Sequence, residues 1–201
     1  MQRTSLSRKG NQQACVRIAS VVLALLLFVS PALATIVQAM SMRDLVRASS
    51  LIVIGQVEGQ QARYDEQGRI VTDVTLRVEE CFHGAVARSS RITIERLGGA
   101  VGDIGMHVEG EPRFENGERL VLFGQRFVTP RGPVVRPVGM AQGVLPMEGE
   151  MVLPNGEGLG LVTRDASGHL APSPSAVTTP RPRDAVVEEI QALVAEVHGA
   201  P

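Results

Sequence analysis

Residues 70–79 place the strongest constraint on the fold, because their apolar and polar side chains largely alternate. The apolar side chains share one parity, namely Ile70, Val74, Leu76 and Val78. The polar side chains share the other, namely Asp73, Thr75, Arg77 and Glu79. Successive side chains of a β-strand point to opposite faces, so the pattern predicts a strand with one face on a core and the other in water.

Further strands are expected before and after this one. The apolar run Leu51–Ile54 is typical of a strand buried on both faces, which continues to about Tyr64 and turns at 65–68. Later, Ile92 and Ile94 alternate with Arg91, Thr93 and Glu95, and apolar runs follow at 120–123, 134–140 and 144–147. About five or six strands in series predict a mainly β domain, a small antiparallel β-barrel or sandwich.

Two helices are expected to flank the strands. Ser41 and Asp44 have the spacing of a capping box, with Asp in place of the usual Glu or Gln, and predict a short N-terminal helix over 42–49. Near the other end, apolar residues recur at helical spacing over 183–198, and Gly199 is a stop signal. This pattern predicts a C-terminal amphipathic helix that packs on its own domain.

The first 34 residues have the pattern of a secretory signal peptide. They carry basic residues but no acidic one, an apolar run at Ile18–Val29, and the sequence Ala32-Leu33-Ala34. This arrangement predicts export to the periplasm or the medium, cleavage after Ala34 and a mature chain that begins at Thr35. The apolar run is shorter than the roughly 20 residues of a membrane-spanning helix. We therefore expect no stable membrane anchor after cleavage.

The mature chain is expected to have three parts. Residues 35–170 form the β-barrel domain, residues 171–182 form a linker rich in Pro and Ser, and residues 183–198 form the C-terminal helix.

Four of the 20 basic residues lie in the signal, which leaves 16 against 21 acidic residues. An acidic chain with few aromatic residues lacks the basic groove and stacking platforms of a nucleic-acid-binding protein.

The residues that carry catalysis or hold metals do not converge in the sequence. His83, His107, His169 and His198 are far apart, which predicts no metal site and no cofactor. Cys81 is the only cysteine after the signal, so cleavage leaves no intramolecular disulfide. Cys81 and His83 share a parity, but we expect Cys81 to be a small buried hydrophobe rather than a nucleophile. The sequence thus predicts a protein that is not an enzyme.

The Gly-rich stretch from Gly98 to Gly110 is the expected binding loop. It does not form the Gly pattern of a phosphate-binding turn. Surface loops that need unusual backbone angles often carry binding residues. The candidate binding residues are Gly98, Gly99, Asp103, Met106, His107 and Gly110.

Three segments of the chain resemble the netrin-type OB-fold domains, a group that includes the tissue inhibitors of metalloproteases. These segments are residues 45–57, residues 75–84 and residues 114–123. The resemblance implies a small OB-like β-barrel. Residues 98–110 are similar to a narrower group of exported bacterial proteins. The inhibitors chelate zinc through an N-terminal cysteine locked by disulfides, whereas this chain is expected to begin at Thr35 without a disulfide pair.

These observations favour an exported, non-enzymatic binding or inhibitor-like module with an exported protein as its partner. Two alternatives stay open at this point. One is a small exported hydrolase that uses Cys81 or His107. The other is a structural component of the envelope that assembles through the C-terminal helix.

Overall fold

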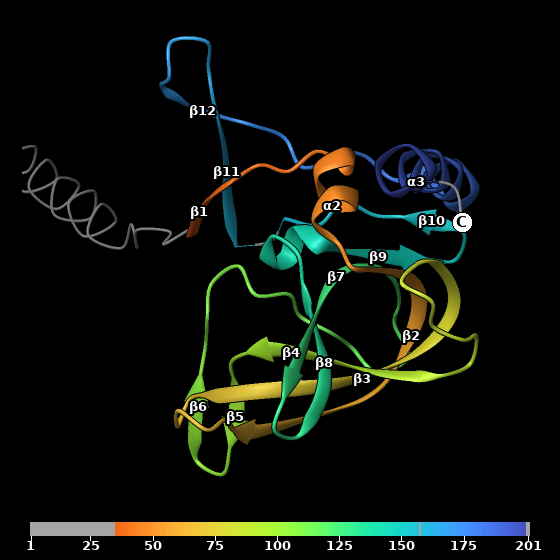
Figure 1. Cartoon of the computed structure of the whole chain (residues 1–201). Helices are drawn as coiled ribbons and strands as arrows, with labels where there is room; N and C mark the ends of the chain where they lie inside the picture. Colours follow the sequence, from red (N-terminus) through yellow and green to blue (C-terminus); the bar gives the residue numbers. More distant parts are fainter. Residues whose placement is uncertain (1–34, 157, 200–201) are drawn as a thin grey trace, which may run out of the picture. The chain divides into compact units, whose positions relative to one another are not determined.

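The computed structural model describes residues 35–156 and 158–199, which form one compact unit (Figure 1). The predicted signal peptide, residues 1–34, lies outside the described residues. The first half of the unit contains β1 (Thr35–Gln38), α2 (Met42–Ala48), β2 (Leu51–Tyr64), β3 (Ile70–His83), β4 (Arg91–Leu97), β5 (Gly99–Val101) and β6 (Ile104–Met106). The second half contains β7 (Arg119–Thr129), β8 (Gly132–Pro137), the 3-10 helix η1 (Met140–Gly143), β9 (Val144–Glu148), β10 (Met151–Val152), β11 (Leu159–Arg164), β12 (Leu170–Pro172), β13 (Arg181–Pro182) and α3 (Arg183–His198). The mainly β class and the two expected helices are confirmed.

The central feature is a ring of five paired strands. The main sheet has the order β13-β10-β9-β7-β2-β3-β4-β8, and β8 also pairs with β7. The pairings therefore run from β2 through β3, β4, β8 and β7 back to β2. The expectation that all strands pair antiparallel is wrong at two places. β4 and β8 are parallel at Ile94 and Val135, and β1 is parallel to β11.

The pattern of residues 70–79 forms the strand that it predicts. Val74, Leu76 and Val78 of β3 are fully buried, and the polar residues between them are partly exposed. Its partner β2 has both faces buried from Leu51 to Ile54, as expected for a continuous apolar run. Register shifts at three positions in the β2–β3 pairing locally increase the twist of the two strands.

Two hydrophobic clusters lie on opposite faces of β2. Leu51 and Val53 belong to a cluster to which all five strands of the ring contribute. Ile52 and Ile54 belong to a second cluster, which also contains the apolar residues of α2 and α3. Successive side chains of a β-strand point to opposite faces, so Leu51 and Val53 lie on one face of β2 and Ile52 and Ile54 on the other. The same strand therefore supports both the ring and the helical layer.

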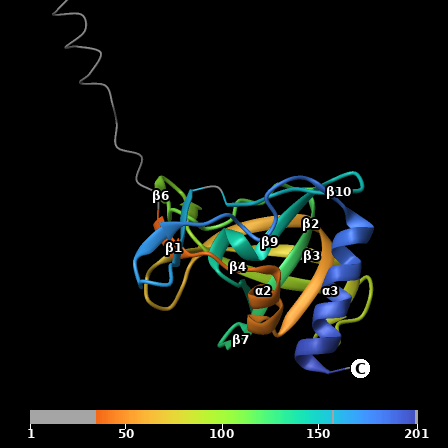
Figure 2. The same cartoon turned by 90° about the horizontal axis from the view of Figure 1, so that it is seen from above.

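The helices pack side by side against the ring (Figure 2). The capping box of α2 forms as expected: Asp44 N donates to Ser41 Oγ over 3.2 Å, and Ser41 N donates to Asp44 Oδ2 over 3.1 Å. Helix α3 buries Val186, Ile190 and Val194. In the part of the chain that the structure describes, neither helix has the length and apolarity needed to cross a membrane.

The segment 171–182, expected to be a linker, is held at three places. Its start belongs to β12, which pairs with β11, and its end belongs to β13, which pairs with β10. Between them, Val177 is only 1% exposed and joins the cluster beneath the helices. The segment therefore ties α3 to the sheet.

We expect Ile190→Ala to lower the free energy of unfolding by about 2–5 kcal/mol, because it leaves a cavity in the cluster under α3. Ile190 is fully buried. Gln191 is the next residue and lies on the exposed face of the helix. Gln191→Ala should change the free energy of unfolding by less than about 0.5 kcal/mol. Urea denaturation followed by circular dichroism measures both. Equal, small effects would show that α3 does not rest on this cluster.

Candidate functional site

The expected binding loop is part of an arm, which we define as residues 98–118, between β4 and β7. The arm first forms a hairpin from β5 and β6 and then continues without regular structure to the start of β7 (Figure 1). Several contacts fix the arm to the remainder of the domain. It is therefore a braced segment with an exposed hairpin, and β5 of that hairpin packs against β2 and β3.

The base of the arm requires glycine. Gly98 N donates to the Ile70 carbonyl over 2.8 Å, and Thr72 Oγ1 donates to the Gly98 carbonyl over 2.6 Å. Gly99 has a φ of 135°, and a Cβ there would lie 2.4 Å from Thr72 Oγ1. A larger residue at position 99 would therefore meet both an unfavourable backbone conformation and the buried hydroxyl that holds the arm.

The far half of the arm is anchored by buried contacts. Phe114 is 5% exposed and joins the cluster of the ring, while its carbonyl accepts a hydrogen bond from Gln60 Nε2 over 3.0 Å. The carbonyl of Gly110 accepts from Ala141 N over 2.9 Å, and the carbonyl of Glu109 accepts from Thr35 Oγ1 over 3.1 Å. Together these contacts position the hairpin relative to the ring.

The six candidate residues divide into two groups. Gly98, Gly99 and Gly110 lie at the anchored parts of the arm, where Gly110 is buried. Asp103, Met106 and His107 lie along the hairpin and just after it; Asp103 and His107 are exposed, and Met106 is partly buried. His107 Nε2 lies 2.9 Å from Glu109 Oε1. The glycines thus shape the arm, and the exposed residues are the ones that can touch a partner.

A pocket of about 330 Å³ lies beside the arm. His107, Arg113 and four glutamates are among the residues that line it; the glutamates are Glu109, Glu111, Glu115 and Glu118. Burial raises the pKa of Glu111 and of Glu118; for Glu118, the hydrogen bond from Glu115 N opposes this shift, and the Glu115 carboxylate adds a smaller effect in the same direction as burial. Within residues 35–156 and 158–199, no group of three His, Cys, Asp or Glu side chains could hold a metal ion.

Cys81 and His83 lie near the end of β3. The thiol donates a hydrogen bond to the His83 carbonyl over 3.3 Å rather than to its ring, and Cys81 packs against the cluster of the ring. The His83 ring stacks on the ring of His198, with centroids 4.0 Å apart and planes 16° apart. His198 Nε2 also donates to the Val46 carbonyl over 3.0 Å, so the pair joins β3, α2 and α3.

Sequence reasoning missed this histidine pair and a buried carboxylate. His83 and His198 come from distant parts of the chain, and no local pattern indicates that they stack. Alternation alone places Glu95 with Arg91 and Thr93 on the polar face of β4, yet Glu95 is only 6% exposed. Arg63 and Arg136 each lie 2.7 Å from its carboxylate oxygens. In the sequence, the only indication of this buried carboxylate was that charged residues of opposite sign occur on strands that become neighbours.

Two comparisons with known proteins leave the chain without a family assignment. A scan against models of protein families gives no match. A search among curated proteins gives no match either. Function is therefore inferred from the residues and their geometry alone.

We expect the domain to be less stable at about pH 5 than at about pH 8, partly through His83, whose effect begins below about pH 6.5. Burial lowers the pKa of His83 below its ordinary value of 6.5, and the neighbouring His198 and Arg126 contribute in the same direction. The unfolded state then takes up a proton at higher pH than the folded state does. The contribution of His83 to stability is consequently fully present above about pH 6.5, and it declines as the pH falls toward the lowered pKa of the folded state.

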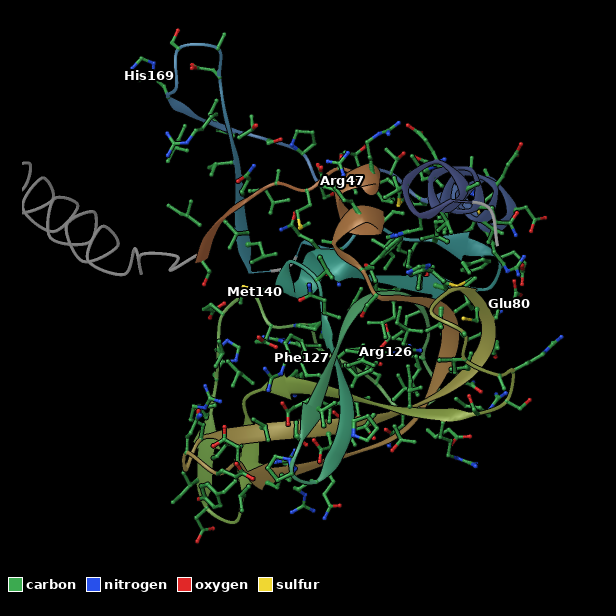
Figure 3. All side chains as sticks on the ribbon, in the orientation of Figure 1. Arg47, Glu80, Arg126, Phe127, Met140 and His169 are labelled. Carbon is green, nitrogen blue, oxygen red and sulfur yellow. The ribbon has the colours of Figure 1, made fainter. Side chains whose placement is uncertain are left out.

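The test compares His83→Gln with His169→Gln across this range by urea denaturation. His169, labelled in Figure 3, lies far out on the hairpin of β11 and β12, and its side chain is 82% exposed. His83→Gln should reduce the pH dependence of the free energy of unfolding, and His169→Gln should leave it unchanged. Identical pH dependence in the wild type and both variants would contradict the expectation.

Proposed function

We propose that this chain is an exported, non-enzymatic binding module that holds another exported protein through the hairpin of the arm. One observation carries this proposal: the arm is fixed at Gly98, Gly110 and Phe114, while Asp103, Ile104 and His107 remain exposed. An exposed hairpin on fixed supports loses little conformational freedom when it binds, which favours affinity. Ile104, at 60% exposed, adds an apolar contact.

We further propose that the ring closes as a small barrel of the OB type, related to the netrin-type domains. An OB-fold is a five-stranded, partly open Greek-key barrel. Support comes from the cyclic pairing of β2, β3, β4, β8 and β7, from the cluster that all five strands share, and from the single residue pair between β4 and β8, which suits a partly open seam.

The zinc-chelating mechanism of the metalloprotease inhibitors is not carried over to this chain. Thr35 replaces the expected terminal cysteine. Its backbone N donates to the Gly158 carbonyl over 3.3 Å, and its Oγ1 donates to the Glu109 carbonyl. A residue that is bound to its own domain in this way is not presented to a metal in a partner. Any inhibitory role would therefore use the arm.

The contacts favour the arm over the two alternatives. Helix α3 directs Val186, Ile190 and Val194 into its own domain, which leaves its apolar face unavailable for assembly with other molecules. The thiol of Cys81 is directed to a carbonyl, and His107 lies next to Glu109 without an adjacent nucleophile in its described contacts. Neither the envelope component nor the hydrolase gains a specific supporting observation.

Export predicts a defined N-terminus. When the full chain is expressed in a bacterium with a secretory pathway, the exported protein should begin at Thr35, as read by N-terminal sequencing. Replacing Ala32 and Ala34 with Arg should block this cleavage and leave the longer chain associated with the membrane fraction. Recovery of the uncleaved chain in the cytoplasm of the wild type would contradict the proposal.

The arm is tested by affinity capture from an envelope extract of the source organism, with the isolated mature chain as bait. A variant with Asp103→Ala, Ile104→Ser and His107→Ala should lose a protein that the wild type retains. Leu170→Ser, which alters an equally exposed apolar residue on another hairpin, should retain it. Equal capture by all three baits would contradict binding through the arm, provided that circular dichroism shows the same fold.

A further inference from the structure

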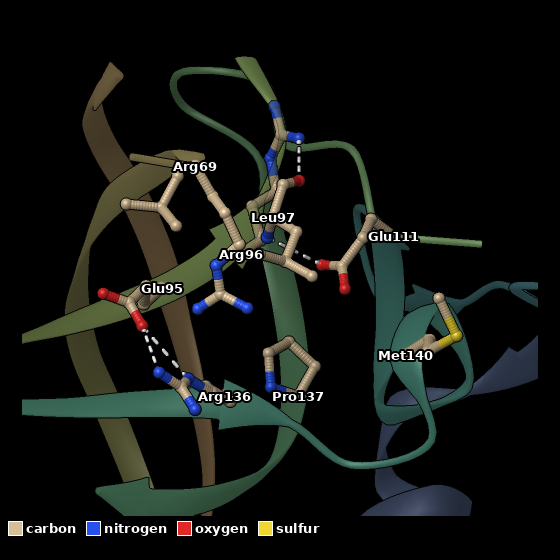
Figure 4. A pocket seen from close by; sticks show the side chains of 9 residues that line it. Arg69, Glu95, Arg96, Leu97, Glu111, Arg136, Pro137 and Met140 are labelled. Atoms are coloured by element: carbon tan, nitrogen blue, oxygen red, sulfur yellow. Dashed lines mark hydrogen bonds and ion pairs between the residues drawn. The ribbon is translucent and has the colours of Figure 1, made fainter. Parts of the chain in front are cut away.

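A second pocket, on the other side of Glu111, is lined by three arginines. Its volume is about 190 Å³, and the side chains of Arg69, Arg96 and Arg136 line it together with Glu95 and Glu111 (Figure 4). These residues come from β4, β8, the arm and the turn before β3. Apolar side chains, including Leu97, Pro137 and Met140, complete the wall. The pocket is therefore polar on one side and apolar on the other.

The charge of Glu95 is already balanced by arginine. Arg136 donates to Oε1 through Nε over 3.0 Å and through a terminal nitrogen over 2.7 Å. Arg63 donates to Oε2 over 2.7 Å and also binds Asp73. Because a buried carboxylate is stable only when it is paired and hydrogen-bonded, these bonds explain why Glu95 tolerates burial. Glu95 thus fixes Arg136 in place beside the pocket.

Hydrogen-bond donors remain on the other two arginines. Arg96 donates to the Leu97 carbonyl over 3.2 Å, while its buried Nε has no hydrogen-bond partner among the described residues. A buried donor without a partner is unfavourable, so a bound anion would stabilise this guanidinium group. Arg69 binds Asp65 through Nε over 2.7 Å. Figure 4 shows its guanidinium group between those of Arg96 and Arg136.

Glu111, on the arm, is the second carboxyl group that lines the pocket. Its Oε2 accepts a hydrogen bond from Leu97 N over 3.2 Å. Burial raises its pKa and thereby favours the neutral form, against the opposite effects of this bond and of Arg96. Burial also lowers the pKa of Arg96, and Arg113 contributes in the same direction. An anion bound next to the arginines would favour the charged form of Arg96 and would raise the pKa of Glu111 further.

We propose that this pocket binds a small organic anion with one carboxylate group and a compact apolar body. Arg136 is paired with Glu95 and Arg69 with Asp65, so Arg96, which among the described residues donates only to the Leu97 carbonyl, is the guanidinium group with the most unused donors. The planar fork of arginine matches a carboxylate in two parallel hydrogen bonds. The wall of Leu97, Pro137 and Met140 accepts the apolar body. This binding does not depend on the partner of the arm.

Titration calorimetry on the mature chain at low salt tests the proposal with benzoate as the probe. Benzoate should bind saturably with one molecule per chain, benzamide should not bind, and inorganic phosphate should bind more weakly. N-Acetylvaline and its primary amide extend the test to the carboxyl end of a peptide. Binding of N-acetylvaline but not of its amide would identify a partner's chain end as a source of the carboxylate, and binding of benzoate alone would identify a free acid.

Matched variants connect the binding to the arginines. Arg96→Met should weaken benzoate about tenfold or more, equivalent to about 1.4 kcal/mol. Arg91→Met removes an exposed arginine from the same strand and should have no effect. If Arg96→Met does not fold, Arg69→Met is the second test. Because Arg69 is about half exposed, this variant should fold, and it should weaken the binding of benzoate to the same extent. Glu111→Gln, which removes a carboxylate but keeps the acceptor for Leu97 N, should tighten binding.

The proposal would be overturned by no saturable binding of either carboxylate, by equal binding of benzoate and benzamide, or by unchanged affinity in the arginine variants. Phosphate binding as tight as benzoate would also overturn it, since it would indicate a general anion site. The arm variant with Asp103→Ala, Ile104→Ser and His107→Ala should bind benzoate normally. Loss of partner capture and loss of carboxylate binding are therefore separate results.

Discussion

The burial of β2 on both faces supports everything else in the domain. Leu51 and Val53 contact the cluster of the ring, and Ile52 and Ile54 contact the cluster beneath the helices. Burial of apolar surface is the main favourable term in folding, and here one strand contributes to it twice. The strand also pairs with β3 over its whole length and with β7 over its first half. The ring and the helices therefore share one support, and the arm is attached to it through Gln60 and Phe114.

The second constraint is the buried charge of Glu95. Removing a carboxylate from water is costly, and the bonds from Arg63 and Arg136 offset this cost only because both guanidinium groups are held in place. Arg136 is held in turn by the ring of Phe127, 4.7 Å from its guanidinium carbon. The result is a fixed arrangement of positive groups at the edge of a pocket. Such preorganisation is what a selective site for a carboxylate needs, because the groups do not have to be ordered on binding.

The two proposed binding regions adjoin but use different chemistry. The hairpin of the arm carries exposed side chains, whereas the arginine pocket is small and half apolar. Glu111 lines the pockets on both sides of the arm, so the anchored part of the arm forms a wall that they share. This arrangement accounts for the long irregular stretch between the hairpin and β7. The stretch is part of the walls of both pockets, and its buried Phe114 keeps it fixed.

Local patterns in the sequence determined which segments became strands and helices. The alternation in β3, the continuous apolar run in β2, the capping box at Ser41 and the helix over 183–198 all depend on neighbours a few residues apart. The Gly-rich loop was also visible, but its role as a braced arm was not. The tertiary structure alone decided how β8 meets β4, that His83 stacks on His198, and that Glu95 is buried. These features depend on contacts between residues distant in the sequence. Such contacts form only when the ring brings the strands together, so no periodic pattern records them.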